Sequence, residues 1–200
     1  MGSGASKKAA KSTRDGTLVA RNGTVAGARV GAGGNELNVD SRLPFPNFRE
    51  LFTLKNYWKT VRRNEQKCAN LIMFKYLKSN PNSQQRYDRL RGLSIESAEC
   101  SEPAFEKLAG SYLKIFDDVI TIVEETPADA SEACKQLTDV GKRHRFKIPS
   151  MKFDDFQQLE SPFLYMIQEV LEDRFNEKAE NLFRKFFQFC LKYILEGFNQ

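Results

Sequence analysis

The chain has 200 residues, of which 40% are hydrophobic and 16 are phenylalanine, enough for one well-packed domain. Lys and Arg number 31 against 26 Asp and Glu, and the excess lies near the N-terminus: residues 1–42 hold seven basic and three acidic side chains, whereas the remainder holds 24 and 23. The near-neutral remainder argues against a broad nucleic-acid-binding face, although a local basic patch is not excluded.

The N-terminal segment differs in composition from the rest of the chain. Residues 1–42 are rich in Gly, Ala, Ser, Thr and Lys and hold no aromatic residue, so they cannot bury enough apolar surface to offset the entropy of ordering. We therefore predict a disordered basic tail over residues 1–45 and a folded domain over residues 46–200.

The tail begins with "MGSGASKK", which fits the pattern for N-myristoylation of Gly2, with Ser6 four residues later. One acyl chain gives marginal membrane binding, and the nearby lysines supply a second, electrostatic attraction to anionic lipid. The alternative is an unmodified, solvated tail. The hypothesis is a chain tethered to an anionic membrane through Gly2.

Cysteine usage and hydropathy predict the compartment. Cys68, Cys100, Cys134 and Cys190 form no C-x-x-C pair, and no apolar stretch reaches the length of a signal core or membrane span. We expect free thiols in a reducing environment, and hence an intracellular, cytoplasmic protein, located at the cytoplasmic face of a membrane if Gly2 is acylated.

From about residue 46 the apolar residues recur at helical spacing. We expect helices along Leu51–Val61, along "CANLIMFKYL" after a capping Asn64, from Pro103 to about Val123, along Ala133–His144, along Phe156–Val170 with a kink at Pro162, and along Ala179–Ile194. No segment of comparable length alternates with period two. The pattern predicts an all-α fold of about six or seven helices.

His144 is the only histidine in the chain. It lies on the same helical stripe as Leu137 and Val140, so its side chain should point into the protein. On this evidence alone, a packed core residue and a metal ligand both remain open. No Cys/His cluster with zinc spacing and no second histidine accompanies it.

Several landmarks, in their order and spacing between about Phe48 and Phe198, resemble the globin family. They are Trp58, Pro81 and Tyr87 around "NPNSQQRYDRL", "LTDVGKRH", and "SPFLYMIQEVL". The resemblance is closest to neuroglobin-like and divergent invertebrate, nematode-type globins, here with an N-terminal extension. It implies a globin fold of about six to eight helices around a pocket for haem b.

The resemblance also implies roles for single residues. His144 matches the proximal ligand of the haem iron, with Val140 and Ile148 beside it in the pocket. Tyr87 takes the place of the phenylalanine that stacks on haem, and the ungapped register puts Leu108, Tyr112 and Met73 on the distal side. Arg89, with Arg143 and Arg145, is expected at the rim, where cations can meet the haem propionates.

These roles imply a protein that binds O₂, CO or NO, or that exchanges an electron with a redox or signalling partner, rather than an enzyme. Two-histidine coordination of iron is excluded because the chain has one histidine. Bound O₂ should escape or oxidise the iron readily, unless the Tyr87 or Tyr112 hydroxyl reaches it. Two alternatives stay open: a redox globin that reduces nitrite or detoxifies nitric oxide, and a globin-fold interaction module without haem.

Overall fold

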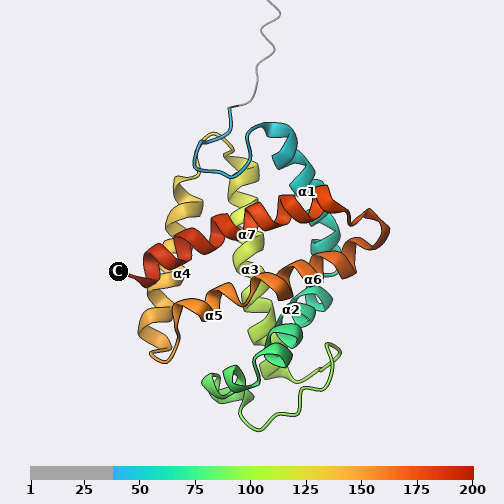
Figure 1. The fold of residues 1–200 in the computed structure, drawn as a ribbon, viewed down its shortest axis with the longest axis vertical. Coiled ribbons are helices and arrows are strands. Elements are labelled where there is room, and N and C mark those ends of the chain that lie inside the picture. Colours follow the sequence, from blue (N-terminus) through green and yellow to red (C-terminus); the bar gives the residue numbers. More distant parts are fainter. Residues whose placement is uncertain (1–37) are drawn as a thin grey trace, which may run out of the picture. The chain divides into compact units, whose positions relative to one another are not determined.

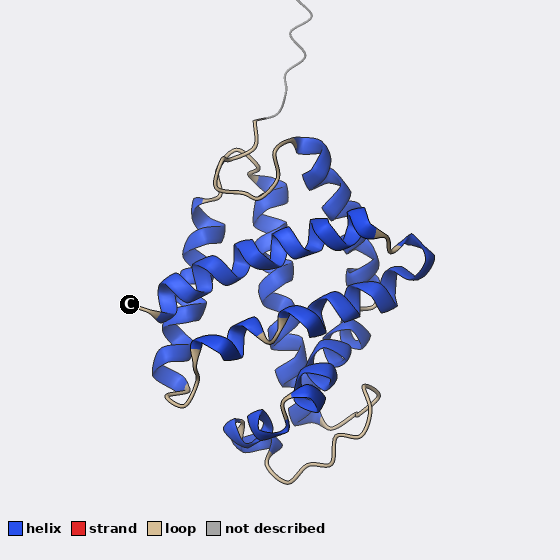
Figure 2. Ribbon diagram, in the orientation of Figure 1, coloured by secondary structure: helices blue, strands red, loops and turns tan. Residues whose placement is uncertain are grey.

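The computed structural model describes residues 38–200, and in this part of the chain every regular element is a helix (Figures 1 and 2). The all-α prediction is confirmed. The elements are α1 (Phe48–Arg63), α2 (Glu65–Ser79), η1 (Pro81–Arg86), η2 (Asp88–Leu90), α3 (Pro103–Glu125), α4 (Ser131–Lys147), α5 (Phe153–Gln157), α6 (Glu160–Leu171), η3 (Glu172–Arg174) and α7 (Glu177–Phe198).

The folded domain begins before the predicted boundary at residue 46. Leu43 and Phe45 are buried in the core. The Asp40 carboxylate accepts hydrogen bonds from the Ala130 N–H and from Arg42, and the Asp40 N–H donates to the Pro127 carbonyl at 2.8 Å. Residues 38–45 therefore belong to the folded domain and not to the predicted tail. The composition of the N-terminal segment gave no sign that Leu43 and Phe45 are core residues. Gly2 and the rest of the predicted tail lie outside the described residues.

The ends of two helices differ in detail from the sequence prediction. Asn64 does stand between α1 and α2, but its side chain donates to the Thr60 carbonyl of the preceding helix and does not cap α2. Side-chain caps do occur at Asn47, which accepts from the Glu50 N–H, and at Asn176, which accepts from the Ala179 N–H. These two asparagines fix where α1 and α7 begin.

The expected helix over Phe156–Val170 is broken into α5 and α6 at residues 158–159, one turn before Pro162. Proline has no N–H to donate to the Gln158 carbonyl, and its ring clashes with the preceding turn of a continuous helix. Pro162 instead occupies the first turn of α6, where that N–H would have no helical partner. Gln158 and Leu159 keep right-handed helical backbone angles, so the predicted kink is a short interruption that lies one turn before Pro162.

An aromatic cluster joins four helices in the core. Trp58 of α1 packs against Phe163 of α6 with ring centroids 6.3 Å apart, and Phe163 packs against Phe116 of α3 at 4.8 Å. Phe183 and Phe186 of α7 complete the cluster. The Trp58 indole N–H donates to the Asp117 carboxylate at 2.8 Å, so its polar atom is satisfied at the edge of the core.

Helix α7 crosses α4 with almost no space between the two backbones (Figure 1). A Cβ atom added at Gly141 would lie 1.9 Å from the Ile194 carbonyl oxygen, and one at Gly197 would lie 1.9 Å from the Thr138 carbonyl oxygen. Only glycine allows this approach at both positions. Gly141 lies less than one turn before His144, so the crossing fixes the position of α4 close to the histidine.

Candidate functional site

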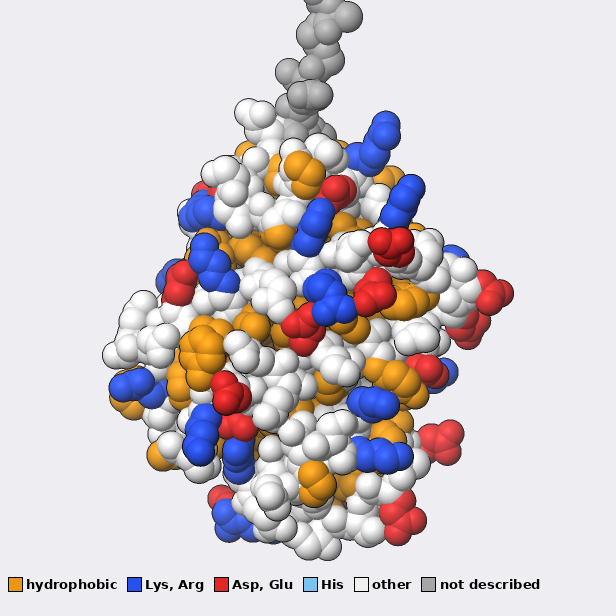
Figure 3. All heavy atoms as spheres, viewed as in Figure 1, with side chains coloured by type: hydrophobic (Ala, Val, Ile, Leu, Met, Phe, Trp, Pro, Cys, Tyr) orange, Lys and Arg blue, Asp and Glu red, His pale blue; other side chains and the backbone are white. Residues whose placement is uncertain are grey.

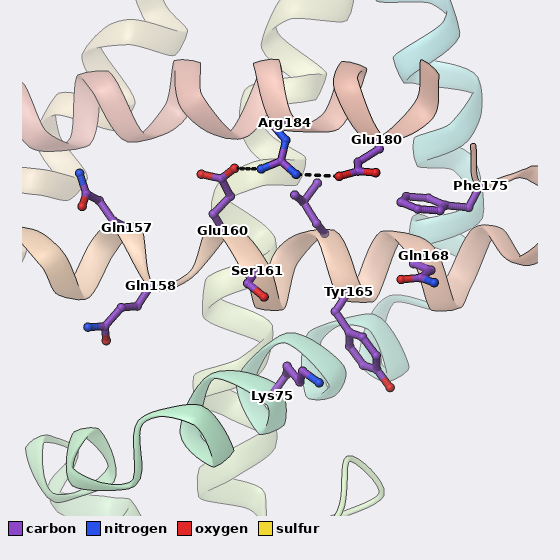
Figure 4. Close-up of a pocket in the computed structure, with 11 residues that line it drawn as sticks. Lys75, Gln157, Gln158, Glu160, Ser161, Tyr165, Gln168, Phe175, Glu180 and Arg184 are labelled. Carbon is purple, nitrogen blue, oxygen red and sulfur yellow. Dashed lines mark hydrogen bonds and ion pairs between the residues drawn. The ribbon is translucent and has the colours of Figure 1, made fainter. Parts of the chain in front are cut away.

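A hollow of about 480 Å³ lies on the surface by α2, α6 and α7 (Figure 4). Its charged groups satisfy one another. Arg184 pairs with Glu160 and Glu180, and the Lys75 ammonium lies 4.3 Å from the centre of the Tyr165 ring. The two carboxylates and the guanidinium of this hollow are thus already paired, and none of the residues predicted from the sequence as site residues lines it.

A second cavity, of about 230 Å³, brings together six of the residues predicted from the sequence. They are Tyr87, Leu108, Tyr112, Val140, His144 and Ile148. The wall is otherwise mostly apolar and comes from α3, α4, α5 and α7, with Ser111, Ile115, Phe116, Met151, Phe156, Leu159 and Ile194. An apolar cavity with a few convergent polar groups is the usual form of a cofactor site.

Two predicted site residues do not line this cavity. Met73 is fully buried in the core on α2, and no residue of α2 contributes to the cavity wall, whose α3 part includes Tyr112 and Phe116. Met73 therefore lies in the core and not on the cavity wall. Arg89 is exposed and lines an adjoining cavity of about 360 Å³ together with Lys107.

The other two arginines expected at the rim line neither cavity. Arg143 and Arg145 are exposed and neither lines the cavity. Arg145 donates a hydrogen bond to the Phe198 carbonyl at 2.9 Å, which joins the end of α4 to the end of α7. Arg143 and Arg145 flank His144 in sequence, and neighbouring positions on a helix face different directions.

The His144 imidazole is oriented by its own helix. Its Nδ1 lies 2.8 Å from the Val140 carbonyl oxygen, an acceptor, so Nδ1 carries the proton and Nε2 is left as the nitrogen with a free lone pair. Burial lowers the pKa of His144, with a further contribution from the positive charge of Arg143. The ring is therefore neutral near pH 7, the form that binds a metal.

Phe156 of α5 packs edge-on against the His144 ring, with centroids 5.5 Å apart. Phe156 in turn contacts Phe198 at the end of α7 at 5.0 Å. The imidazole is thus restricted by a hydrogen bond within α4 and by aromatic contact from another helix. This is the kind of support that holds a ligand in one orientation.

Two tyrosine hydroxyls meet in the same cavity. The Tyr87 and Tyr112 hydroxyl oxygens are 2.7 Å apart, and the hydrogen bonds of the described residues give neither a second partner. Burial raises the pKa of Tyr87 to about 12 and raises that of Tyr112 well above 10, so both phenols keep their protons. The two hydroxyl groups have two protons, but the hydrogen bond between them uses only one. The other O–H is therefore left without an acceptor in an apolar space.

An ion pair joins the two sides of the cavity. Arg86, next to Tyr87, contacts the carboxylate of buried Asp155 at 2.6 Å, and Asp155 adjoins Phe156 on α5. The Lys152 backbone N–H donates to the same carboxylate at 2.7 Å. The corner that carries Tyr87 and the helix that packs on His144 are thereby held together.

The residues present fit haem better than a bare metal ion. No group of three His, Cys, Asp or Glu side chains able to hold a metal occurs within residues 38–200, so a metal at His144 must bring its other ligands with it, as haem iron does. The cavity alone is smaller than the roughly 300–1,000 Å³ typical of cofactor pockets. The adjoining cavity shares Tyr87, Leu108 and Ser111 with it, and the two together fall within that range.

Sequence reasoning missed the wall contributed by other parts of the chain. Met151 follows the α4–α5 turn, and Ile194 belongs to the last helix. Ile194 was predicted on an apolar stripe, and nothing in that stripe distinguishes a cavity position from an ordinary core position. Phe156 and Leu159 likewise lay on a predicted stripe, and nothing in that stripe marked them as cavity positions.

Comparisons with known proteins support the fold. No family model matches the sequence, and no curated protein sequence matches it. Among solved structures, a hexacoordinated haem protein from an anhydrobiotic tardigrade superposes with a TM-score of 0.71 and 20% sequence identity, over 80% of this chain and 99% of that chain. The described part of the chain thus has the globin fold that its landmarks predicted.

Proposed function

We propose that this protein binds haem b in the His144 cavity, with His144 Nε2 as the one protein ligand to iron. The observation that carries the proposal is the neutral imidazole whose Nδ1 is bound to the Val140 carbonyl within an apolar cavity. The likeness to a solved haem protein supports it. Titration of the purified chain with haem should saturate at one haem per chain; binding without a stoichiometric end point would contradict it.

Haem iron in such a site supplies binding of a diatomic gas or exchange of one electron. The residues of the chain would supply the surroundings: His144 would bind the iron through Nε2, and the apolar wall would limit access of water. The tardigrade protein is described as hexacoordinated. Coordination by two histidines cannot occur here because the chain has only one.

The tyrosine pair determines which ligand the site favours. We infer that the unsatisfied O–H of the Tyr87–Tyr112 pair donates to a ligand with partial negative charge, such as O₂ bound to iron. Leu108 has no hydrogen-bond donor, and the tyrosine O–H would supply the donor that stabilises O₂ in its place. CO depends less on a hydrogen-bond donor, so removal of the hydroxyl should change CO binding less than O₂ binding.

Replacing both tyrosines by phenylalanine tests this assignment. Tyr87→Phe/Tyr112→Phe keeps the rings and removes the hydroxyls, so O₂ dissociation should become faster by about 10- to 100-fold, the effect of losing one hydrogen bond to a charged acceptor. CO dissociation should change little. Stopped-flow measurement of both rates is the check, and equal O₂ rates in the wild type and the double variant would remove the tyrosines from ligand binding.

We also propose that Gly2 is myristoylated and that the basic residues of the N-terminal segment 1–37 attach the chain to anionic membrane at the cytoplasmic face. The support is the sequence pattern "MGSGASKK". No helix within residues 38–200 is long and apolar enough to cross a bilayer. A tether suits a redox or signalling role beside a membrane-bound partner better than oxygen storage.

Fractionation of eukaryotic cells that express the wild type or Gly2→Ala tests the tether. The wild type should sediment with membranes, and Gly2→Ala should move largely to the supernatant because one of the two attachment signals is lost. Ser6→Ala offers a milder change within the same recognition pattern. Equal distribution of the wild type and Gly2→Ala would exclude an acyl anchor.

A further inference from the structure

The end of α4 and the turn that follows form a local concentration of positive charge on a domain that is near-neutral as a whole. Residues 142–153 contain five Lys or Arg side chains and no Asp or Glu. The five are Lys142, Arg143, Arg145, Lys147 and Lys152, and none forms an ion pair within the described residues. We call residues 142–153 the α4–α5 patch.

Two large aromatic side chains are exposed in the same patch. Phe146 is 77% exposed and Phe153 is 42% exposed, and among the described residues Phe52 is the one other large hydrophobic side chain in this class. The Met151 N–H donates to the Ile148 carbonyl at 2.9 Å, which closes a tight turn between the two phenylalanines. Figure 3 shows Lys and Arg beside hydrophobic side chains at the lower left, where α4 ends and α5 begins in Figure 1, with acidic side chains next to them.

The inner side of the patch is anchored in the domain. His144, Ile148 and Met151 line the cavity, and Arg145 is bound to the Phe198 carbonyl. The exposed phenylalanines and cations are therefore carried by a supported backbone. Cations at a helix C-terminus are also explained by the helix dipole, but the dipole gives no reason to expose Phe146.

We propose that the α4–α5 patch is a membrane-contact surface of the domain itself, which binds anionic phospholipid headgroups through its cations and inserts Phe146 at the interface. An exposed aromatic among cations is the combination that partitions into a bilayer interface. Charge complementarity commits the patch to anionic lipid. Binding there would turn the His144 side of the cavity toward the bilayer. The proposed binding of lipid by the α4–α5 patch depends on neither haem nor acylation of Gly2.

Vesicle flotation of the full-length Gly2→Ala chain tests the proposal, with vesicles of phosphatidylcholine alone or with phosphatidylserine. Arg143→Glu/Lys147→Glu should reduce binding to the phosphatidylserine vesicles by at least about tenfold, since each cation near such a surface contributes roughly fivefold. Arg63→Glu/Lys67→Glu is the control: both residues are exposed, belong to α1 and α2, and give the same change in net charge.

A second pair of variants tests the aromatic contact. Phe146→Ser should weaken vesicle binding, whereas Phe52→Ser, at a phenylalanine that is 50% exposed on α1, should not. Circular dichroism of each variant separates loss of binding from loss of fold. If the charge-reversed patch and its control bind alike, the tail or net charge accounts for binding and the proposal is overturned. Binding to phosphatidylcholine alone that equals binding to phosphatidylserine would overturn it as well.

Discussion

Replacing His144 by alanine should abolish stoichiometric haem binding and the Soret band of coordinated haem. The substitution removes the one imidazole in the chain and the only cavity nitrogen with a free lone pair. The fold should survive, because the side chain is only partly buried and makes one hydrogen bond, typically worth about 1 kcal/mol. Absorption spectroscopy after reconstitution and circular dichroism measure the two effects.

His144→Gly provides the control for that experiment. Free imidazole should enter the space left by the side chain and restore a histidine-like spectrum if coordination is all that was lost. Variant chains that bind haem as tightly as the wild type, with the same spectrum, would contradict the assignment of His144. Loss of helical signal in both variants would instead identify His144 as a core residue.

Gly141→Ala should be strongly destabilising. The new methyl group would lie 1.9 Å from the Ile194 carbonyl oxygen, and a backbone atom within a helix cannot move aside as a flexible side chain can. Overpacking typically costs about 1–3 kcal/mol, and we expect the upper end or more, since α4 and α7 must separate. For a chain of this size, about 3 kcal/mol lowers Tm by roughly 6–12 °C.

Gly110→Ala is the matched control on α3, where an added Cβ meets nothing within 4 Å. It should raise stability by up to about 1 kcal/mol through helix propensity. Thermal unfolding of both variants is the measurement. The Gly141→Ala chain should also bind haem less tightly, because His144 stands less than one turn further along the displaced helix. A Tm equal to that of Gly110→Ala would show that the two helices are not in close contact.

The fold was largely predictable because its helices carry long apolar stripes and its globin landmarks keep their order. His144 could be placed in the interior from its spacing to Val140 alone. The start of the domain could not be predicted from the sequence. Leu43 and Phe45 are two apolar residues just beyond a Gly-rich segment, and only their burial distinguishes them from the tail. Pro162 signalled a disturbance, but not that the helix would break before it.

The site was predictable where register along one helix decides the outcome. Leu108 and Tyr112 came from an ungapped count from Tyr87 within the globin resemblance, the helical repeat of α3 then places them one turn apart, and both line the cavity. The positions of Met73 and Arg89 depend on how other elements pack, which residue spacing does not encode. Met73 lines neither cavity, and Arg89 lines the adjoining one. The hydrogen bond between Tyr87 and Tyr112 joins residues 25 positions apart. It places two hydroxyl groups in a cavity whose wall is otherwise mostly apolar.

The most direct test of haem binding through His144 is the absorption spectrum of the reconstituted wild-type chain in its ferric, ferrous and ferrous-CO forms. We expect one haem per chain and a ferrous-CO spectrum typical of an iron with a neutral histidine opposite CO. A spectrum indistinguishable from that of free haem, or one typical of thiolate coordination, would contradict the proposed site.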